Sequence, residues 1–213
     1  MDGLHFIYFA DPMCSWCWGF APVIDRLNEA YGEALPIRLV LGGLRPGTDQ
    51  VMTEAAKQST RTHWEHVTEA SGQPFDYAFF DRQDFIYDTD PASRATVLVR
   101  KERPDRALAF LHRAQRAFYA ENQDVTKPQV LADLAAEFGL DRNEVLANLD
   151  TDELKHETWR DYGVSQRAGV RGFPTLIVGP NADNTFAMVT SGFQPAEVIL
   201  PMIDQWLAGL RAA

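Results

Sequence analysis

The chain has 213 residues, with 20 basic and 30 acidic side chains and a formal net charge of -10. Its hydrophobic share of 46% and charged share of 23% are ordinary for a soluble globular protein and exclude intrinsic disorder. The negative charge repels phosphate backbones and anionic lipids, so we expect neither a nucleic-acid partner nor a membrane-surface role.

The amino terminus carries no pattern for export. Residues Met1 to Ile7 lack the basic and apolar regions of a secretory signal, and no apolar run approaches the roughly 20 residues of a membrane-spanning helix. We therefore expect a cytoplasmic protein. In a reducing compartment, a pair of cysteines is more often catalytic or metal-binding than a structural brace.

The first forty residues predict a strand, a helix and a second strand. His5 to Ala10 is an apolar, aromatic run typical of a buried strand. After Asp11-Pro12, apolar residues recur at helical spacing from Trp16 to Tyr31, and Pro36 to Leu41 is a second buried strand closed by two glycines. Both cysteines fall where the predicted helix begins.

The middle of the chain, from about Thr48 to Arg167, has a helical pattern and almost no strand pattern. Helices are predicted to start at Thr126, Asp141 and Thr151, the first with a glutamine three residues later and a proline in its first turn. This stretch therefore predicts a bundle of several short helices.

Strands return near the carboxyl end. Thr175 to Val178 and Thr185 to Thr190 are predicted strands, separated by the turn-rich residues 179–184. Apolar side chains from Val198 to Leu210 then share one helical face. The order of elements is β-α-β, a helical insertion, then β-β-α, which predicts an α/β fold.

The only two cysteines lie three residues apart in the run Cys14-Ser15-Trp16-Cys17. On the first turn of a helix, such residues face the same way and can approach disulfide geometry. Unpaired N–H groups and the positive end of the helix dipole favour a thiolate, so we expect a lowered pKa for Cys14. Cys14 would attack a disulfide, and Cys17, one turn deeper, would resolve the mixed disulfide.

Two other uses of the cysteine pair are less favoured. A static disulfide across so short a loop adds little stability. A zinc site needs about four ligands, and the sequence has no second cysteine pair. His63 and His66, three apart on an acidic helix, are typical of solvated or capping residues. We therefore predict no metal site.

The residues around the cysteines, from Phe9 to Phe20, resemble the DsbA family of the thioredoxin-fold superfamily, particularly its cytosolic FrnE-like and predicted disulfide-isomerase branch. The segment Gly169 to Thr175 is similar to the family's cis-proline loop. The resemblance covers nearly the whole chain. It implies a thioredoxin-like domain formed by residues 1–48 and 166–213, and a separate helical insertion domain at residues 49–165.

The resemblance also implies the substrate site. A cis bond between Phe173 and Pro174 would pack this loop against the two sulfurs. The substrate-binding surface would consist of Trp16, Trp18, Phe173 and Pro174, with Ser15, Asp11 and Thr175 completing the motifs. Asp11 considered alone fits a turn residue before proline, or a group that assists proton transfer at Cys17, and Phe20 fits the core.

The implied function is thiol–disulfide exchange on protein or small-molecule disulfides. The pair between the cysteines is Ser-Trp, where the family pattern has Pro-His, and a reducing cytosol favours disulfide reductase or isomerase activity over net oxidation. No bound cofactor is expected; glutathione or a reductase partner would recycle the enzyme. No pattern indicates an oligomeric state.

Two alternatives remain open. A kappa-class glutathione transferase or 2-hydroxychromene-2-carboxylate isomerase shares the architecture, but commonly has serine where Cys14 stands and lacks the second cysteine. A redox-switched binding or chaperone module would use the same apolar groove without turnover.

Overall fold

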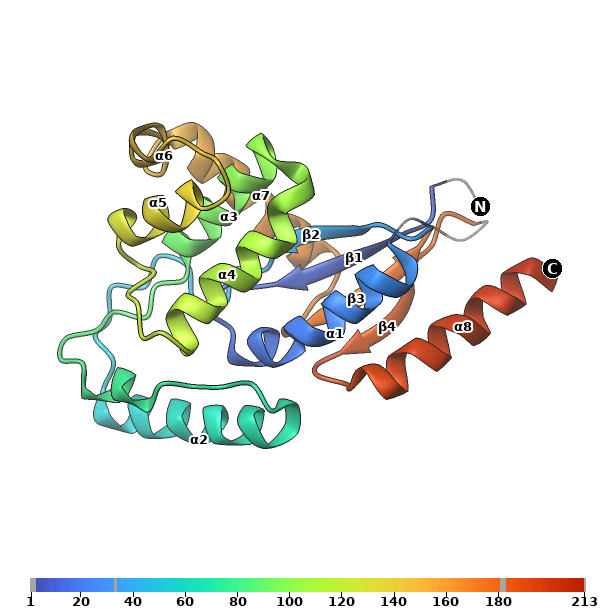
Figure 1. Ribbon diagram of the computed structural model, residues 1–213, viewed down its shortest axis with the longest axis horizontal. Helices are drawn as coiled ribbons and strands as arrows, with labels where there is room; N and C mark the ends of the chain where they lie inside the picture. The colour runs from blue at the N-terminus through green and yellow to red at the C-terminus, as the bar shows by residue number, and fades with distance from the viewer. Residues whose placement is uncertain (1–2, 33, 181–182, 213) are drawn as a thin grey trace.

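The structure, a computed structural model, describes residues 3–32, 34–180 and 183–212, with side chains described to residue 209. Its centre is a sheet with the strand order β2-β1-β3-β4 (Figure 1). The strands are β1 (His5–Ala10), β2 (Ile37–Leu41), β3 (Thr175–Gly179) and β4 (Ala187–Ser191). β1 runs parallel to β2 and antiparallel to β3, and β3 runs antiparallel to β4. The predicted α/β, thioredoxin-like order of elements is therefore confirmed.

Helices α1 (Ser15–Tyr31) and α8 (Ala196–Ala212) lie along one face of this sheet. The remaining helices follow β2 in the chain and gather near the end of the sheet where β1 finishes (Figure 1). They are α2 (Glu54–Ser71), α3 (Asp90–Glu102), α4 (Ala107–Tyr119), α5 (Pro128–Ala136), α6 (Arg142–Asn148) and α7 (Asp152–Arg167), with short 3-10 turns at η1 (Tyr77–Asp81) and η2 (Pro104–Arg106). No helix in the described part of the chain is long and apolar enough to cross a bilayer.

An ion pair ties the helical insertion to the exposed edge of β2. Arg100 on α3 and Asp161 on α7 form a salt bridge of 2.6 Å. Arg100 also donates to the backbone carbonyl of Leu39, 2.8 Å away, and Asp161 accepts the N–H of Leu41 at 2.9 Å. The pair therefore satisfies polar groups that an edge strand leaves open, and it fixes α3 and α7 beside the strand end that leads into the site.

Two of the predicted element starts hold, and two differ from the structure. The side chains of Asp141 and Thr151 cap α6 and α7 as predicted. Thr126 does not cap α5, whose N-cap residue is Lys127, because the Thr126 hydroxyl donates to the carboxylate of Asp124 at 2.6 Å. Threonine side chains often prefer such local bonds. The last strand begins two residues later than predicted, at Ala187. Residues 181 and 182, and the side chain of Leu210, lie outside the described residues.

Candidate active site at the start of helix α1

The two cysteines occupy the beginning of α1, as the sequence predicts. Cys14 is the N-cap residue, with an extended backbone (φ -96°, ψ 116°), and Cys17 lies within the first turn. Both are free thiols. Cys14 keeps 6% of its surface exposed, whereas Cys17 is fully buried. A disulfide in solution can therefore reach Cys14 first.

The surroundings of Cys17 favour its protonated form. Burial raises the pKa of the Cys17 thiol well above its ordinary value, and the hydrogen bond and charge of Cys14 raise it further. The backbone N–H of Asp11 acts in the opposite direction by donating to the sulfur. Cys17 is thus a buried, protonated thiol behind Cys14. This state suits a group that reacts only after a substrate is attached to Cys14.

The loop before β3 faces Cys14 from the other side of the site. The peptide bond between Phe173 and Pro174 is cis. The Cys14 thiol donates to the Phe173 carbonyl oxygen at 3.5 Å. The Thr175 hydroxyl donates to the Gly172 carbonyl at 2.8 Å, and the Pro174 carbonyl accepts the N–H of Gly192 at 2.7 Å. These bonds hold the Phe173 carbonyl at a fixed place beside the thiol.

The Phe173 ring packs directly on the backbone that follows β2. A Cβ atom added to Gly42 would lie 2.0 Å from the Phe173 ring, and one added to Gly43 would lie 2.9 Å from the ring of Tyr162. Gly43 also has a positive φ of +71°, which favours glycine. The sequence predicted these glycines only as the end of a strand. In the structure they make room for two aromatic side chains at the edge of the site.

Asp11 connects two loops of the site. One carboxylate oxygen accepts the N–H of Met13 at 2.8 Å, which is the turn role predicted from the sequence, and the other accepts the N–H of Leu44 at 2.7 Å. The side chain is fully buried. Burial raises its pKa to about 6, although the N–H groups of Leu44 and Met13 partly offset that rise. Asp11 therefore joins the cysteine loop to the loop after β2 and titrates near neutral pH.

A pair of buried tyrosines from the insertion supports the same loop. The Tyr87 hydroxyl donates to the carbonyl of Met13, the residue before Cys14, at 2.9 Å. The Tyr119 hydroxyl lies 3.2 Å from that of Tyr87. Sequence reasoning missed both residues, because no local pattern indicates a contact between residues 13 and 87.

The aromatic residues beside the cysteines have different environments. Trp16 is half-buried and packs against Phe193 from the loop before α8, with ring centroids 5.8 Å apart. Trp18 is 6% exposed, and its indole N–H donates to the Pro74 carbonyl at 3.0 Å. Trp18 lies in the first turn of α1, with its indole against the insertion, and its predicted contact with substrate stays a prediction. Phe20 is in the core, as predicted.

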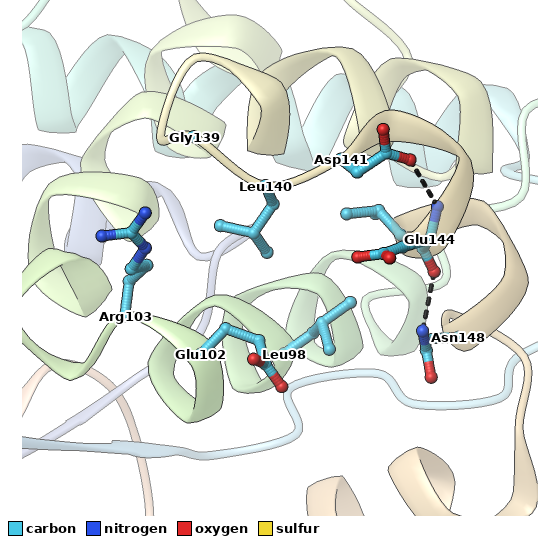
Figure 2. Close-up of a pocket in the computed structure, with 9 residues that line it drawn as sticks. Leu98, Glu102, Arg103, Gly139, Leu140, Asp141, Glu144 and Asn148 are labelled. Atoms are coloured by element: carbon cyan, nitrogen blue, oxygen red, sulfur yellow. Dashed lines mark hydrogen bonds between the residues drawn. The ribbon is translucent and has the colours of Figure 1, made fainter.

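A hollow of about 320 Å³ lies in the insertion, between α3 and α6 (Figure 2). Two of its polar side chains, those of Asp141 and Asn148, make hydrogen bonds within α6 and its N-cap. Asp141 accepts the N–H of Glu144 at 3.0 Å, and Asn148 donates to the Glu144 carbonyl at 2.7 Å. Within the described residues, no group of three or more His, Cys, Asp or Glu could hold a metal ion. The cysteine site is therefore the candidate for chemistry.

Two free thiols at a helix start, facing a cis-proline loop on a β-α-β and β-β-α sheet, define a thioredoxin-type thiol site. The sequence profile of a family described as Thioredoxin matches residues 7–200. The chain belongs to this thioredoxin family. The resemblance to DsbA-type proteins is confirmed by the solved structures that share its fold.

A candidate protein disulfide isomerase from Nitrosomonas europaea is 33% identical, with a TM-score of 0.89 over 98% of this chain and 99% of that one. The cytosolic disulfide reductase DsbM from Pseudomonas aeruginosa is 25% identical, with a TM-score of 0.74 over 98% and 97% of the two chains; DsbM has also been solved with GSH. The ClpXP adapter protein SpxH of Halalkalibacterium halodurans is 25% identical over 96% of this chain and 68% of that protein.

Proposed function

We propose that the protein is a thiol–disulfide oxidoreductase of the cytoplasm, which reduces or isomerises disulfides through Cys14 and Cys17. The observation that carries the proposal is the contrast between the two sulfurs. Cys14 reaches the surface beside the Phe173 carbonyl, and Cys17 is buried one turn behind it. The disulfide reductase activity in the name of DsbM, and the isomerase assignment of the Nitrosomonas protein, support the same chemistry.

The proposed reaction has two exchanges. The Cys14 thiolate attacks a substrate disulfide, one substrate sulfur leaves as a thiolate, and a mixed disulfide forms on Cys14. Cys17 then gives up its proton and attacks the Cys14 sulfur, the second substrate sulfur leaves and is protonated to a thiol, and a Cys14–Cys17 disulfide remains. Two electrons pass from the protein to the substrate, so two external thiols must restore the dithiol.

Glutathione is the reductant that we propose for this last step, with a protein reductase as the other source of thiols. The structure of DsbM with GSH supports this choice. No bound organic cofactor enters the reaction. In isomerisation the mixed disulfide on Cys14 is attacked by another substrate thiol, and no external reductant is consumed.

The proposed substrate surface consists of the apolar groups on either side of Cys14. Trp16 and Phe193 form a half-buried aromatic pair at the start of α1. Phe173 lies on the opposite side, and its carbonyl meets the thiol. Leu44, held by Asp11, is 40% exposed. This surface suits an extended peptide or a small thiol tripeptide more than a highly charged ligand.

A direct test is insulin reduction by the purified protein, coupled to glutathione and glutathione reductase. We expect turnover by the native chain and its loss in both Cys14→Ala and Cys17→Ala. Native turnover no higher than that of Cys14→Ala would overturn the proposal. Conjugation of glutathione to an electrophile, unaffected by Cys17→Ala, would instead support the kappa-class or 2-hydroxychromene-2-carboxylate isomerase alternative.

A second candidate function is partner binding without turnover. It is favoured by the name ClpXP adapter protein, which belongs to relatives that match 96% of this chain. Such an adapter would hold a partner on the surface around Cys14 and switch with the redox state of the pair. The insulin assay separates the two functions, because an adapter would show redox-dependent binding and no reduction above the Cys14→Ala background.

A further inference from the structure

Tyr8 places an unsatisfied hydroxyl group beside the cysteine pair. It lies in the middle of β1 and is fully buried. Its hydroxyl makes no hydrogen bond of normal geometry among the residues that the structure describes. The Cys17 thiol is within interaction range of that hydroxyl, and burial together with the charges of Cys17 and Cys14 raises the pKa of Tyr8. A buried hydroxyl without a partner costs stability, so a functional role would explain its presence at this position.

The Tyr8 ring cannot turn its hydroxyl elsewhere without disturbing the sheet. The residue pairs with Leu39 on β2 and with Leu176 on β3, so neighbouring strands fix its backbone on both sides. Its ring packs against Phe20 of α1 at 6.0 Å. The hydroxyl therefore stays between the sheet and the first turns of α1, where Cys17 lies.

The proposed reaction places negative charge on the Cys17 sulfur, which a hydrogen bond from the Tyr8 hydroxyl can stabilise. When Cys17 attacks a mixed disulfide, or leaves when the internal disulfide is reduced, its sulfur carries negative charge in a fully buried place. Buried anions require hydrogen-bond donors. The backbone N–H of Asp11 is one donor. Cys14 cannot be another at these moments, because its sulfur is in a disulfide.

The other charged groups around this place are acidic. The Asp11 carboxyl faces Cys17, and Asp25 of α1 acts on Tyr8. The charge of Asp11 disfavours a thiolate at Cys17, and the charge of Asp25 disfavours loss of the proton from Tyr8. Among the groups that act on this pair, the Tyr8 hydroxyl is the side-chain donor that remains. We propose that Tyr8 is a positioning residue whose hydroxyl donates a hydrogen bond to the charged Cys17 sulfur. The O–H bond stays intact, and the proton is not transferred.

This inference rests on the proposed function, and a two-phase thiol assay separates their failures. The reduced protein is mixed with Ellman's reagent, which releases one thionitrobenzoate when Cys14 attacks and a second when Cys17 resolves the mixed disulfide. A native chain that releases only the first would overturn the proposed exchange, and Tyr8 with it. A normal native second phase that Tyr8→Phe leaves unchanged would overturn the Tyr8 inference alone.

We expect Tyr8→Phe to leave the first release unchanged and to slow the second about 10-fold, with its pH midpoint about one unit higher. Its thermal stability should equal or exceed that of the native chain, because the change removes an unsatisfied hydroxyl. Tyr31→Phe is the matched control: its hydroxyl, also near α1, binds the Leu200 carbonyl and Asp204, and both phases should stay unchanged. Tyr8→Leu, which also lacks a donor, is a second variant and should slow the same phase; a native rate and pH profile in either folded variant would contradict the proposal.

Discussion

The Cys14 thiol lies 3.5 Å from the carbonyl oxygen of Phe173, although 159 residues separate the two in the chain. The pairing of β1 with β3 produces this contact. Phe9, five residues before Cys14, pairs with Thr175, two residues after Phe173. Because antiparallel pairing fixes the register of both strands, the cysteine loop after β1 and the cis-proline loop before β3 meet at the same end of the sheet. The site therefore depends on the sheet as a whole.

The difference in exposure between the two sulfurs predicts which one captures a substrate. In Cys17→Ala, Cys14 can still attack, but nothing resolves the product, so mixed disulfides should accumulate in cells. In Cys14→Ala, the remaining sulfur is buried and should capture little. Non-reducing gels followed by mass spectrometry of the trapped partners measure both, and equal trapping by the two variants would show that the order of attack is wrong.

Much of this site could be predicted from local sequence. The cysteine pair at a helix start and the strand before it each have a pattern within a few residues, and both lie where expected. The proline loop was expected from the family resemblance, and it precedes β3. The contact of Trp18 with the insertion could not be predicted, because the sequence does not show which face of α1 the insertion covers. Its indole binds Pro74, 56 residues away.

The supports of the site could not be predicted, since each is a contact across a long stretch of chain. Tyr87 reaches the Met13 carbonyl over 74 residues. Gly42 matters because the Phe173 ring occupies the space where a side chain would be. The sequence predicted the turn role of Asp11. Its second hydrogen bond, from the N–H of Leu44, depends on where the loop after β2 lies and could not be predicted. Helical pattern predicts that an insertion exists, but not which of its side chains reach the site.

The raised pKa of Asp11 predicts a pH-dependent contribution to stability. Its pKa is about 6 in the folded protein and about 3.9 in an unfolded chain. Between these values the folded state binds more protons, so the contribution of Asp11 to the free energy of unfolding falls as pH rises. The fall should amount to roughly 1–3 kcal/mol and be complete above about pH 7.

Asp11→Asn removes this titration, and it also removes one of the two acceptors for the N–H groups of Met13 and Leu44. The variant should be less stable than the native chain at pH 4, and the difference should shrink as pH rises through 6. Urea unfolding of both proteins at several pH values between 4 and 8 measures it. A stability difference that does not change with pH would show that the Asp11 carboxyl does not titrate in this range.

The tyrosine pair predicts unequal costs for two similar substitutions. Tyr87→Phe removes the donor to the Met13 carbonyl and leaves the Tyr119 hydroxyl without its partner, so it should destabilise the protein by about 1–3 kcal/mol. Tyr119→Phe keeps the bond to Met13 and should cost less, about 1 kcal/mol. Met13 directly precedes Cys14, so the loss of its hydrogen bond in Tyr87→Phe should also slow insulin reduction. Tyr119→Phe keeps that bond and should slow the reaction less.

Chemical unfolding of both variants and of the double variant completes this comparison as a cycle. The two hydroxyls interact, so their costs should not add, and the double variant should be close to Tyr87→Phe. Additive costs, or a larger loss in Tyr119→Phe, would show that Tyr87 does not hold the cysteine loop in this way.

The close approach of Phe173 to Gly42 predicts the effect of a single methyl group. In Gly42→Ala the new Cβ would meet the Phe173 ring at 2.0 Å, so the ring and its carbonyl must move away from Cys14. We expect a loss of about 1–3 kcal/mol in stability and a clear loss of insulin reduction. Gly209→Ala on α8 is the control, because nothing lies within 4 Å of its added Cβ, and it should keep full activity.

A smaller side chain at position 173 tests whether this contact causes the losses in Gly42→Ala. Phe173→Leu in the Gly42→Ala background frees space for the methyl group, so it should recover stability and part of the activity lost in Gly42→Ala alone. The same Phe173→Leu change in the native chain should lower stability, because it removes ring contacts without relieving a clash. Opposite signs of one substitution in the two backgrounds would establish that Gly42 holds open the place of the Phe173 ring, whereas equal effects would contradict it.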